Sequence, residues 1–275
     1  MVACSPSPVT PSWRNVHAAP CTMAGMYLEE LVDPRHAALS VVDMQNDFCD
    51  FNGALARSGS DPGLIQAMAP RLLRLLDGAR RVKIPIVHVR TEHSPWTDSA
   101  SWIGRHHERP RTVCYPGSWG ADYFPGFEPR ADASREPGRH EFVVTKHRYS
   151  GFVGTDLDLV LRSHSVRTVI MTGEATNVCV ESTARDAFMR DYWVVFVSDC
   201  TASTVQAAHD ATLFTMDRHF ATVATSQEVL AAWSATCAWT DGDGSGKPEL
   251  SDSLGLRRGL ADETANCQAV SGEQL

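Results

Sequence analysis

Short apolar runs rich in Val, Ile and Leu alternate along the chain with stretches in which apolar residues recur every three or four positions. The first pattern is typical of buried strands in a parallel sheet, and the second of amphipathic helices. Strands are predicted at residues 37–44, 86–90, 141–145, 168–172, 193–198 and 221–224. Helices are predicted at residues 64–82, 155–163, 178–192, 203–218 and 226–233. The alternation predicts a single α/β domain, a doubly wound (Rossmann-like) parallel sheet of about six strands with helices on both faces.

The alternation stops at both ends of the chain and once in its middle. Residues 1–36 contain scattered prolines and polar residues, which indicates a weakly ordered N-terminal arm. Residues 235–275 are mostly polar, which predicts a disordered C-terminal tail. The predicted domain therefore covers residues 37–234. Within it, residues 91–139 lack periodicity, and a long irregular segment of this kind often forms a lid or a substrate-binding loop.

Composition narrows the class of protein. The chain has 275 residues, a formal net charge of -8 and 43% hydrophobic residues, which suits one large globular domain with tails. The acidic balance argues against nucleic-acid binding. No apolar run approaches the ~18 residues that a membrane-spanning helix needs, and the N-terminus has no pattern of a secretory signal. Because the eight cysteines form no CxxC pair, we expect reduced thiols in a cytoplasmic protein.

Cys179 lies where a predicted strand, residues 168–172, gives way through Gly173 to a helix. In the first helical turn a thiol feels the positive end of the helix dipole, which favours the thiolate. Nearby backbone N–H groups have no partner within the helix and are free to bind an oxyanion. Cys179 is therefore a candidate nucleophile. The alternative is a buried structural cysteine, because free cysteines are among the most buried residues.

Asp43 and Lys146 follow two other predicted strands. The carboxyl ends of parallel strands share one edge of the sheet, where ligands bind in α/β proteins. Asp43 would take the thiol proton of Cys179 and return it to a leaving amine, while Lys146 would tune both groups by its charge. Alternatively, Asp43 begins a surface loop and Lys146 extends its ammonium into solvent.

Three segments carry a resemblance to a known family. They are VVDMQNDF at residues 41–48, TKHRYSGF at residues 145–152 and TGEATNVCVESTARDA at residues 172–187. In this order they resemble the motifs of the isochorismatase-like cysteine hydrolase superfamily, over about residues 37 to 234. The last two are most similar to the ureidoacrylate amidohydrolase branch.

The resemblance implies roles for individual residues. It assigns a catalytic triad to Asp43, Lys146 and Cys179, and an oxyanion hole to the N–H groups of Ala175 and Cys179. It also implies a cis peptide bond between Glu174 and Ala175. The activity implied is cleavage of a C–N bond in a small linear amide, most simply a ureide or carbamoyl compound such as ureidoacrylate, through an acyl-enzyme on Cys179.

Departures from the family pattern bear on the substrate. The Asp-x-His pair of metal-dependent nicotinamidases is missing after the first strand, and isochorismatases that hydrolyse vinyl ethers lack the cysteine, so both activities are disfavoured. The loop histidines His93, His106 and His107 have no recognisable ligand spacing, so we expect no metal and no cofactor. The predicted substrate contacts are Asn46, Trp119 and Tyr149.

Two alternatives to a ureide hydrolase stay open. One is an amidase acting on biuret, N-carbamoylsarcosine, maleamate or nicotinamide, and the other is a catalytically silent binding member of the fold. The expected partner is a small-molecule substrate. Family resemblance also predicts a homo-oligomer, in which the tryptophans of the irregular segment (Trp96, Trp102 and Trp119) shape either a pocket or a subunit contact.

Overall fold

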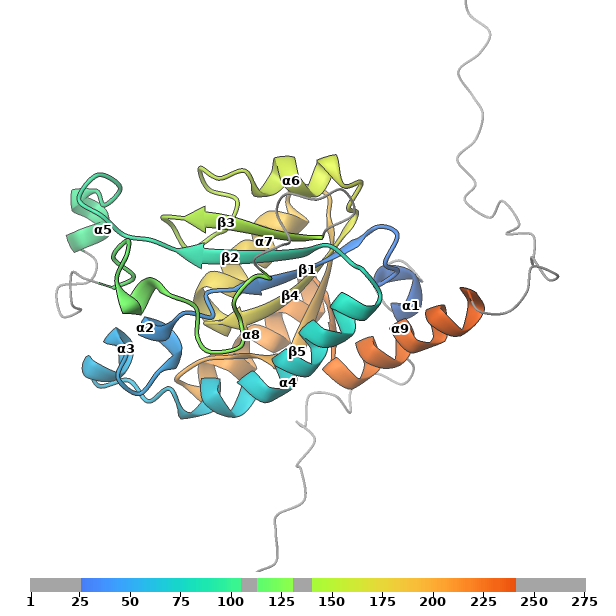
Figure 1. Cartoon of the computed structure of the whole chain (residues 1–275), viewed down its shortest axis with the longest axis horizontal. Helices are drawn as coiled ribbons and strands as arrows, with labels where there is room; N and C mark the ends of the chain where they lie inside the picture. The colour runs from blue at the N-terminus through green and yellow to red at the C-terminus, as the bar shows by residue number, and fades with distance from the viewer. Residues whose placement is uncertain (1–25, 105–112, 131–139, 241–275) are drawn as a thin grey trace, which may run out of the picture. The chain divides into compact units, whose positions relative to one another are not determined.

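The computed structural model describes residues 26–104, 113–130 and 140–240 (Figure 1). Within these ranges one sheet has six strands in the order β3-β2-β1-β4-β5-β6, and all neighbouring pairs are parallel. The strands are β1 (Ala37–Val42), β2 (Ile86–Thr91), β3 (Glu141–Lys146), β4 (Thr168–Glu174), β5 (Trp193–Ala202) and β6 (Thr222–Ala224). The predicted fold class is confirmed.

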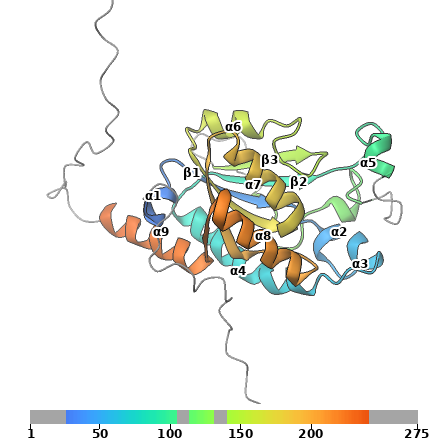
Figure 2. The same ribbon diagram turned by 180° about the vertical axis from the view of Figure 1, so that it is seen from behind.

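Helices cover both faces of the sheet, as the two opposite views show (Figures 1 and 2). One face carries α1 (Leu28–Leu31), α4 (Gly63–Arg81) and α9 (Ser226–Thr240). The other carries α6 (Leu157–Ser163), α7 (Glu181–Phe188) and α8 (Gln206–His219). Four short segments lie outside these layers: α2 (Asn46–Cys49), α3 (Ala54–Arg57), α5 (Ala100–Gly104) and the 3₁₀ turn η3 (Trp119–Ala121).

The longest helix, α4, illustrates how sequence spacing becomes packing. Its fully buried side chains recur mostly at three- and four-residue intervals. They join the core on the sheet face that α1, α4 and α9 cover, and they are Ile65, Met68, Leu72, Leu75, Leu76 and Ala79. Each large aliphatic side chain that is removed from water stabilises the fold by about 1.5–3 kcal/mol. This apolar stripe holds α4 against the sheet and keeps the strand ends in fixed relative positions.

The strand order reverses between β1 and β4, which is where α/β sheets of this kind generally form a ligand crevice. Chain connections leave β1 toward one edge of the sheet and β4 toward the other, so the loops after these strands diverge. Gly173, near the end of β4, has φ +111°, and a Cβ there would lie 2.1 Å from the Val42 carbonyl oxygen. Glycine therefore lets β4 lie close to β1 at the point where the strand order reverses.

Several predicted boundaries need correction. The N-terminal arm is shorter than residues 1–36, because α1 is helical and Leu31 is buried in the core. The C-terminal tail begins later than residue 235, because α9 continues to Thr240; residues 1–25 and 241–275 lie outside the described ranges. Strands β4 and β5 extend beyond their predicted ends, since polar residues continue the backbone ladder there. No helix in the described part of the chain has the length and apolarity to cross a membrane.

Candidate active site

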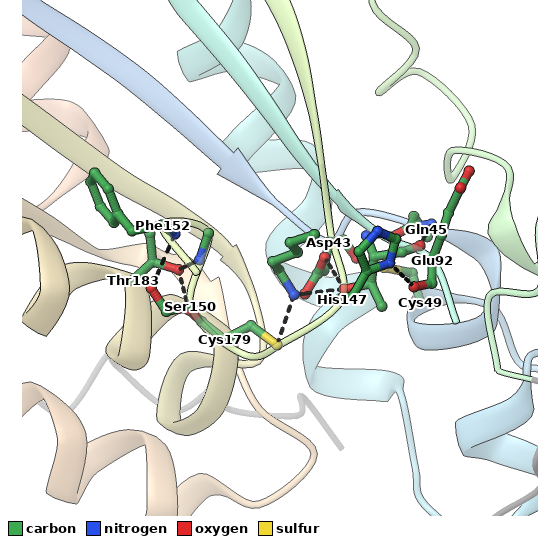
Figure 3. Close-up of polar contacts among 12 residues, drawn as sticks. Asp43, Gln45, Cys49, Glu92, His147, Ser150, Phe152, Cys179 and Thr183 are labelled. Carbon is green, nitrogen blue, oxygen red and sulfur yellow. Dashed lines mark hydrogen bonds and ion pairs between the residues drawn. The ribbon is translucent and has the colours of Figure 1, made fainter. Parts of the chain in front are cut away.

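Asp43, Lys146 and Cys179 meet at the carboxyl edge of the sheet. The Lys146 ammonium nitrogen lies 2.7 Å from Asp43 Oδ2 and 3.4 Å from the Cys179 sulfur, on the contacts drawn in Figure 3. The Asp43 and Lys146 side chains are 0% and 1% exposed, and Cys179 is half-buried. The lysine is therefore a buried cation between a carboxylate and a thiol, and neither the surface-loop nor the solvent-exposed alternative describes these two residues.

The backbone of Asp43 turns sharply just beyond β1. Its φ is +52°, in the left-handed region that Asp tolerates better than most residues. Its N–H still donates to the Val89 carbonyl of β2 at 2.8 Å, and its own carbonyl accepts from the Gln45 N–H at 2.7 Å. Both sides of this turn are thus fixed by hydrogen bonds, which orients the carboxylate toward Lys146.

Thr91 connects the two charged residues. It ends β2, where it pairs in register with Lys146 of β3. Its hydroxyl accepts a hydrogen bond from Lys146 Nζ at 2.6 Å and donates one to Asp43 Oδ1 at 2.8 Å. Because β2 lies between β1 and β3, the Thr91 hydroxyl lies between the aspartate that follows β1 and the lysine that ends β3, and it bonds both. Sequence reasoning missed Thr91, although its place at a strand end is the same signal that identified Asp43 and Lys146.

Cys179 lies in a π-helical turn, η4 (Thr176–Val180), which continues directly into α7. The N–H groups of Val178 and Val180 both donate to the Ala175 carbonyl. The carbonyl of Cys179 accepts a hydrogen bond from the Thr183 hydroxyl at 2.7 Å, and the same hydroxyl accepts from the Gly151 N–H at 3.0 Å. Thr183 thereby ties the cysteine turn to the segment after Lys146 (Figure 3).

The resting charge state differs from the one expected from the helix dipole. Burial raises the pKa of the Cys179 thiol well above its ordinary value; the Lys146 ammonium opposes this rise, and the Asp43 and Glu174 carboxylates add to it. Although burial acts to lower the pKa of Lys146, the Asp43 carboxylate holds that pKa above its usual value. At neutral pH the site therefore holds an aspartate–lysine ion pair beside a neutral thiol.

The peptide bond between Glu174 and Ala175 is cis, as the resemblance implies. It joins the end of β4 to the turn that carries Cys179. The amide groups of Ala175 and Cys179 thus belong to the first residues of a helical segment, where backbone N–H groups lack helical acceptors. Their role as an oxyanion hole stays a prediction.

A second set of buried polar side chains lies beside the cluster of Asp43, Lys146 and Cys179. The Gln45 amide nitrogen donates to the carbonyls of Thr91 and Ala121 at 2.9 and 2.8 Å, and its oxygen accepts the Thr91 N–H at 2.7 Å. Asp47 accepts the N–H groups of Ala54 and Cys114 at 2.9 and 2.7 Å. Gln45 and Asp47 thus tie the segment after β1 to the end of β2 and to the described loop that contains Cys114 and Ala121. Both residues lie in the VVDMQNDF segment, where polar residues at alternate positions could have indicated that Gln45 and Asp47 point to the same side as Asp43.

The predicted substrate contacts have different environments. Asn46 is buried, and its amide nitrogen donates to the Trp119 carbonyl at 2.8 Å, which gives it a structural role. The Trp119 side chain is half exposed. Tyr149 is partly buried, with its ring 4.8 Å from that of Trp102. Contact of Asn46, Trp119 or Tyr149 with substrate stays a prediction.

Of the three loop histidines, His93 lies in the described part of the chain. His93 bonds Asp98 at 3.0 Å between Nδ1 and Oδ1, while His106 and His107 lie outside the described residues. Among the residues that the structure describes, no group of three or more His, Cys, Asp or Glu side chains is placed to hold a metal ion. Trp96, by contrast with Trp102, is almost fully exposed.

Comparison with known proteins gives a consistent picture. Residues 37–228 match the model of the isochorismatase domain. Ureidoacrylate amidohydrolase RutB of Enterobacter sp. is 34% identical over 207 residues, which are 70% of this chain and 86% of that protein. The enzyme of the same name from Methylobacterium radiotolerans is 33% identical over 204 residues, covering 69% and 76% of the two chains.

Solved structures share the fold. An isochorismatase-like hydrolase from Alkaliphilus metalliredigens is 32% identical with a TM-score of 0.57, covering 72% of this chain and 99% of that one. N-carbamoylsarcosine amidase from Thermoplasma acidophilum is 30% identical with a TM-score of 0.55, covering 70% and 96%. The match of the domain model over most of the chain shows that this protein belongs to the isochorismatase family.

Proposed function

We propose that the chain is a cysteine-dependent amidohydrolase that cleaves a C–N bond of a small linear ureide or carbamoyl compound, such as ureidoacrylate. Hydrolysis of amide C–N bonds is the activity that family membership and the named relatives support. The observation that carries the cysteine mechanism is the buried cluster of Asp43, Lys146 and Cys179, with the lysine in contact with both other groups.

The first half of the reaction forms an acyl-enzyme. Cys179 Sγ attacks the carbonyl carbon while Asp43 takes the thiol proton, so a neutral thiol at rest becomes a nucleophile only as the C–S bond forms. The N–H groups of Ala175 and Cys179 bind the oxyanion. The C–N bond then breaks, and Asp43 gives the proton to the leaving amine. Lys146 keeps Asp43 oriented and compensates the negative charge that passes between sulfur and carboxylate.

The second half returns the enzyme to its starting state. Water attacks the thioester carbonyl and Asp43 takes its proton, after which the C–S bond breaks and Cys179 regains a proton. For a ureide attacked at its carbonyl, the acyl-enzyme is a carbamoyl thioester and the released acid is carbamate, which decomposes to ammonia and carbon dioxide. Ammonia is therefore a readout common to all the substrates considered.

The test is ammonia release from ureidoacrylate, biuret, N-carbamoylsarcosine, maleamate and nicotinamide. We expect release from a ureide by the wild-type protein and none from Cys179→Ala. Cys200→Ala is the matched control, because Cys200 is a buried free cysteine of β5 with no contact to the triad among the described residues. Full activity of Cys179→Ala would refute the nucleophile, and release only from another amide would refute the ureide.

Alkylation of Cys179 tests the resting state of the site. Because the thiol pKa is raised, its reaction rate with iodoacetamide is expected to keep rising with pH through about pH 9, beyond the pKa of an ordinary thiol. A rate that levels off below pH 7 would instead establish a resting thiolate. Mass spectrometry of the labelled peptide distinguishes Cys179 from the other cysteines.

Location and assembly complete the proposal. Cysteines without a disulfide pattern support a cytoplasmic enzyme, and the family resemblance supports a homo-oligomer. Sedimentation velocity of the full chain measures the assembly directly. A mass equal to one chain across the micromolar range would contradict the oligomer.

A further inference from the structure

His93 lies two residues beyond the end of β2, next to the site but outside the triad. Its backbone N–H donates to the Cys114 carbonyl at 3.2 Å, and its side chain is 16% exposed. The Nδ1 atom lies 3.0 Å from Asp98 Oδ1. The preceding residue, Glu92, donates its N–H to the Lys146 carbonyl at 3.1 Å. The imidazole is thus held on the loop that directly adjoins the triad lysine.

One aromatic ring packs against this imidazole, and a second aromatic ring packs against the first. The ring of Trp102, from α5, lies 5.5 Å from the His93 ring and 4.8 Å from the ring of Tyr149. The Arg148 guanidinium lies 5.0 Å from the Trp102 ring, and its Nη1 donates to the Thr97 carbonyl at 3.0 Å. These contacts join the loops after β2 and β3 into one wall, which restricts the motion of the His93 ring.

The contact with Asp98 fixes the tautomer of His93. A carboxylate only accepts hydrogen bonds, so Nδ1 carries the proton and Nε2 presents a lone pair. Burial lowers the pKa of His93; Asp98 opposes this, and the charges of Lys146 and Asp43 also act on the ring with opposite signs. The imidazole is therefore neutral at neutral pH. No described residue bonds its Nε2 atom.

We propose that His93 is a specificity-determining residue whose Nε2 accepts a hydrogen bond from an N–H group of the amide or ureide substrate. This inference deepens the proposed function and rests on it. A ureide presents N–H donors on both sides of its carbonyl, whereas an ester of the same shape lacks them. A fixed acceptor favours the donor and leaves an unsatisfied polar atom when the donor is missing, which is how enzymes reject isosteric analogues.

Two substitutions of His93 separate substrate recognition from a structural role. In His93→Asn the amide nitrogen takes the place of Nδ1 and keeps a donor for Asp98, but no atom replaces Nε2. In His93→Gln the side-chain oxygen reaches the former Nε2 position. Recognition through Nε2 predicts that KM for the ureide rises roughly tenfold to hundredfold in His93→Asn, with kcat within threefold, and that His93→Gln retains most of the affinity. A structural role through Asp98 predicts the reverse order.

Asp98→Ala perturbs the same atom without changing His93. Alanine removes the acceptor opposite Nδ1, so the proton is no longer held on Nδ1 and Nε2 is no longer fixed as an acceptor. We expect KM to rise as in His93→Asn. The matched control is His219→Asn, a change at an exposed histidine that ends α8. An unchanged KM in both His93→Asn and Asp98→Ala overturns the inference, as does a loss in His93→Gln equal to that in His93→Asn.

A pair of alkylating agents tests the inference even if no ureide is a substrate. Iodoacetamide carries a primary amide, whereas methyl methanethiosulfonate has no N–H group. At pH 9, His93→Asn should slow modification of Cys179 by iodoacetamide and leave modification by methyl methanethiosulfonate unchanged. Equal slowing of both reagents would mean that His93 only supports the fold. Failure of the wild type to hydrolyse any ureide would refute the proposed function separately, because this pair of rates does not depend on turnover.

Discussion

Substitution of Thr91 by valine tests whether the position of the triad depends on one buried hydroxyl. Valine has nearly the shape of threonine but cannot bond Lys146 or Asp43. The side chain is almost fully buried, and both bonds that it makes, at 2.6 and 2.8 Å, involve charged partners. Loss of the hydroxyl leaves one Asp43 oxygen and one Lys146 hydrogen without that partner, while the direct 2.7 Å ion pair remains.

The expected cost follows from these two bonds. A hydrogen bond to a charged group contributes about 1.5–3 kcal/mol, so the two together contribute at most about 6 kcal/mol. Because the remaining ion pair recovers part of this, we expect the free energy of unfolding to fall by about 3 kcal/mol. That is a large share of the ~5–15 kcal/mol of a typical domain. If a similar amount is lost from the transition state, kcat/KM falls roughly hundredfold.

The assay combines urea unfolding with steady-state ammonia release, and Thr91→Ser is the control. Serine keeps the hydroxyl and removes one methyl group, which costs about 1 kcal/mol by lost burial. Thr91→Ser should therefore retain most of the activity of the wild type, and Thr91→Val should not.

Two results would refute the reasoning. Activity of Thr91→Val within twofold of the wild type would show that Asp43 and Lys146 hold their positions without the hydroxyl. Equal losses in Thr91→Val and Thr91→Ser would show that the methyl group, and not the hydrogen bonds, decides the effect.

Two further predictions concern stability. Burial acts to raise the pKa of Glu141, but hydrogen bonds from His88 and Arg80 outweigh it and lower this pKa from 4.5 to about 2. The folded carboxylate therefore contributes stability above pH 4.5, and this contribution is lost as the pH falls toward 2. A difference of this size between the folded and unfolded pKa corresponds to at most about 3 kcal/mol. Unfolding by urea at pH 6 and pH 3 should show this loss in the wild type but not in Glu141→Gln, and equal pH dependence would contradict it. In Gly120→Ala the new Cβ would lie 2.1 Å from Asp47 Oδ2, so we expect at least about 2 kcal/mol of destabilisation; an unchanged thermal midpoint would show that the Asp47 carboxylate moves freely.

Much of the fold could be predicted from local patterns. The run at residues 194–197 is apolar on both faces, which is typical of a buried parallel strand, and the spacing between the predicted strands leaves room for crossover helices. Boundaries were less predictable where polar residues continue a strand, as in β4 and β5. Short helices such as α5 are set by contacts with other segments, so the irregular sequence around Trp102 gave no periodic signal.

Some residues of the candidate site could likewise be predicted from local sequence, and others could not. A charged or nucleophilic residue at a strand end is a local signal, and it identified Asp43, Lys146 and Cys179. Thr91 and Gln45 also lie at or just after strand ends, but threonine and glutamine occur there for many structural reasons, so position alone did not distinguish them. Their role depends on which strands are neighbours, and strand order is a property of the sheet as a whole.

The sequence by itself determined the α/β class, the family motifs and the chemical types available for catalysis, because each depends on residues close together in the chain. Only the tertiary structure decided that Lys146 lies between Asp43 and Cys179, and that burial raises the pKa of the Cys179 thiol. Distances and burial arise when β1, β3 and the turn after β4 are brought to one edge of the sheet. The helix dipole is a local effect, and desolvation by the assembled fold outweighs it.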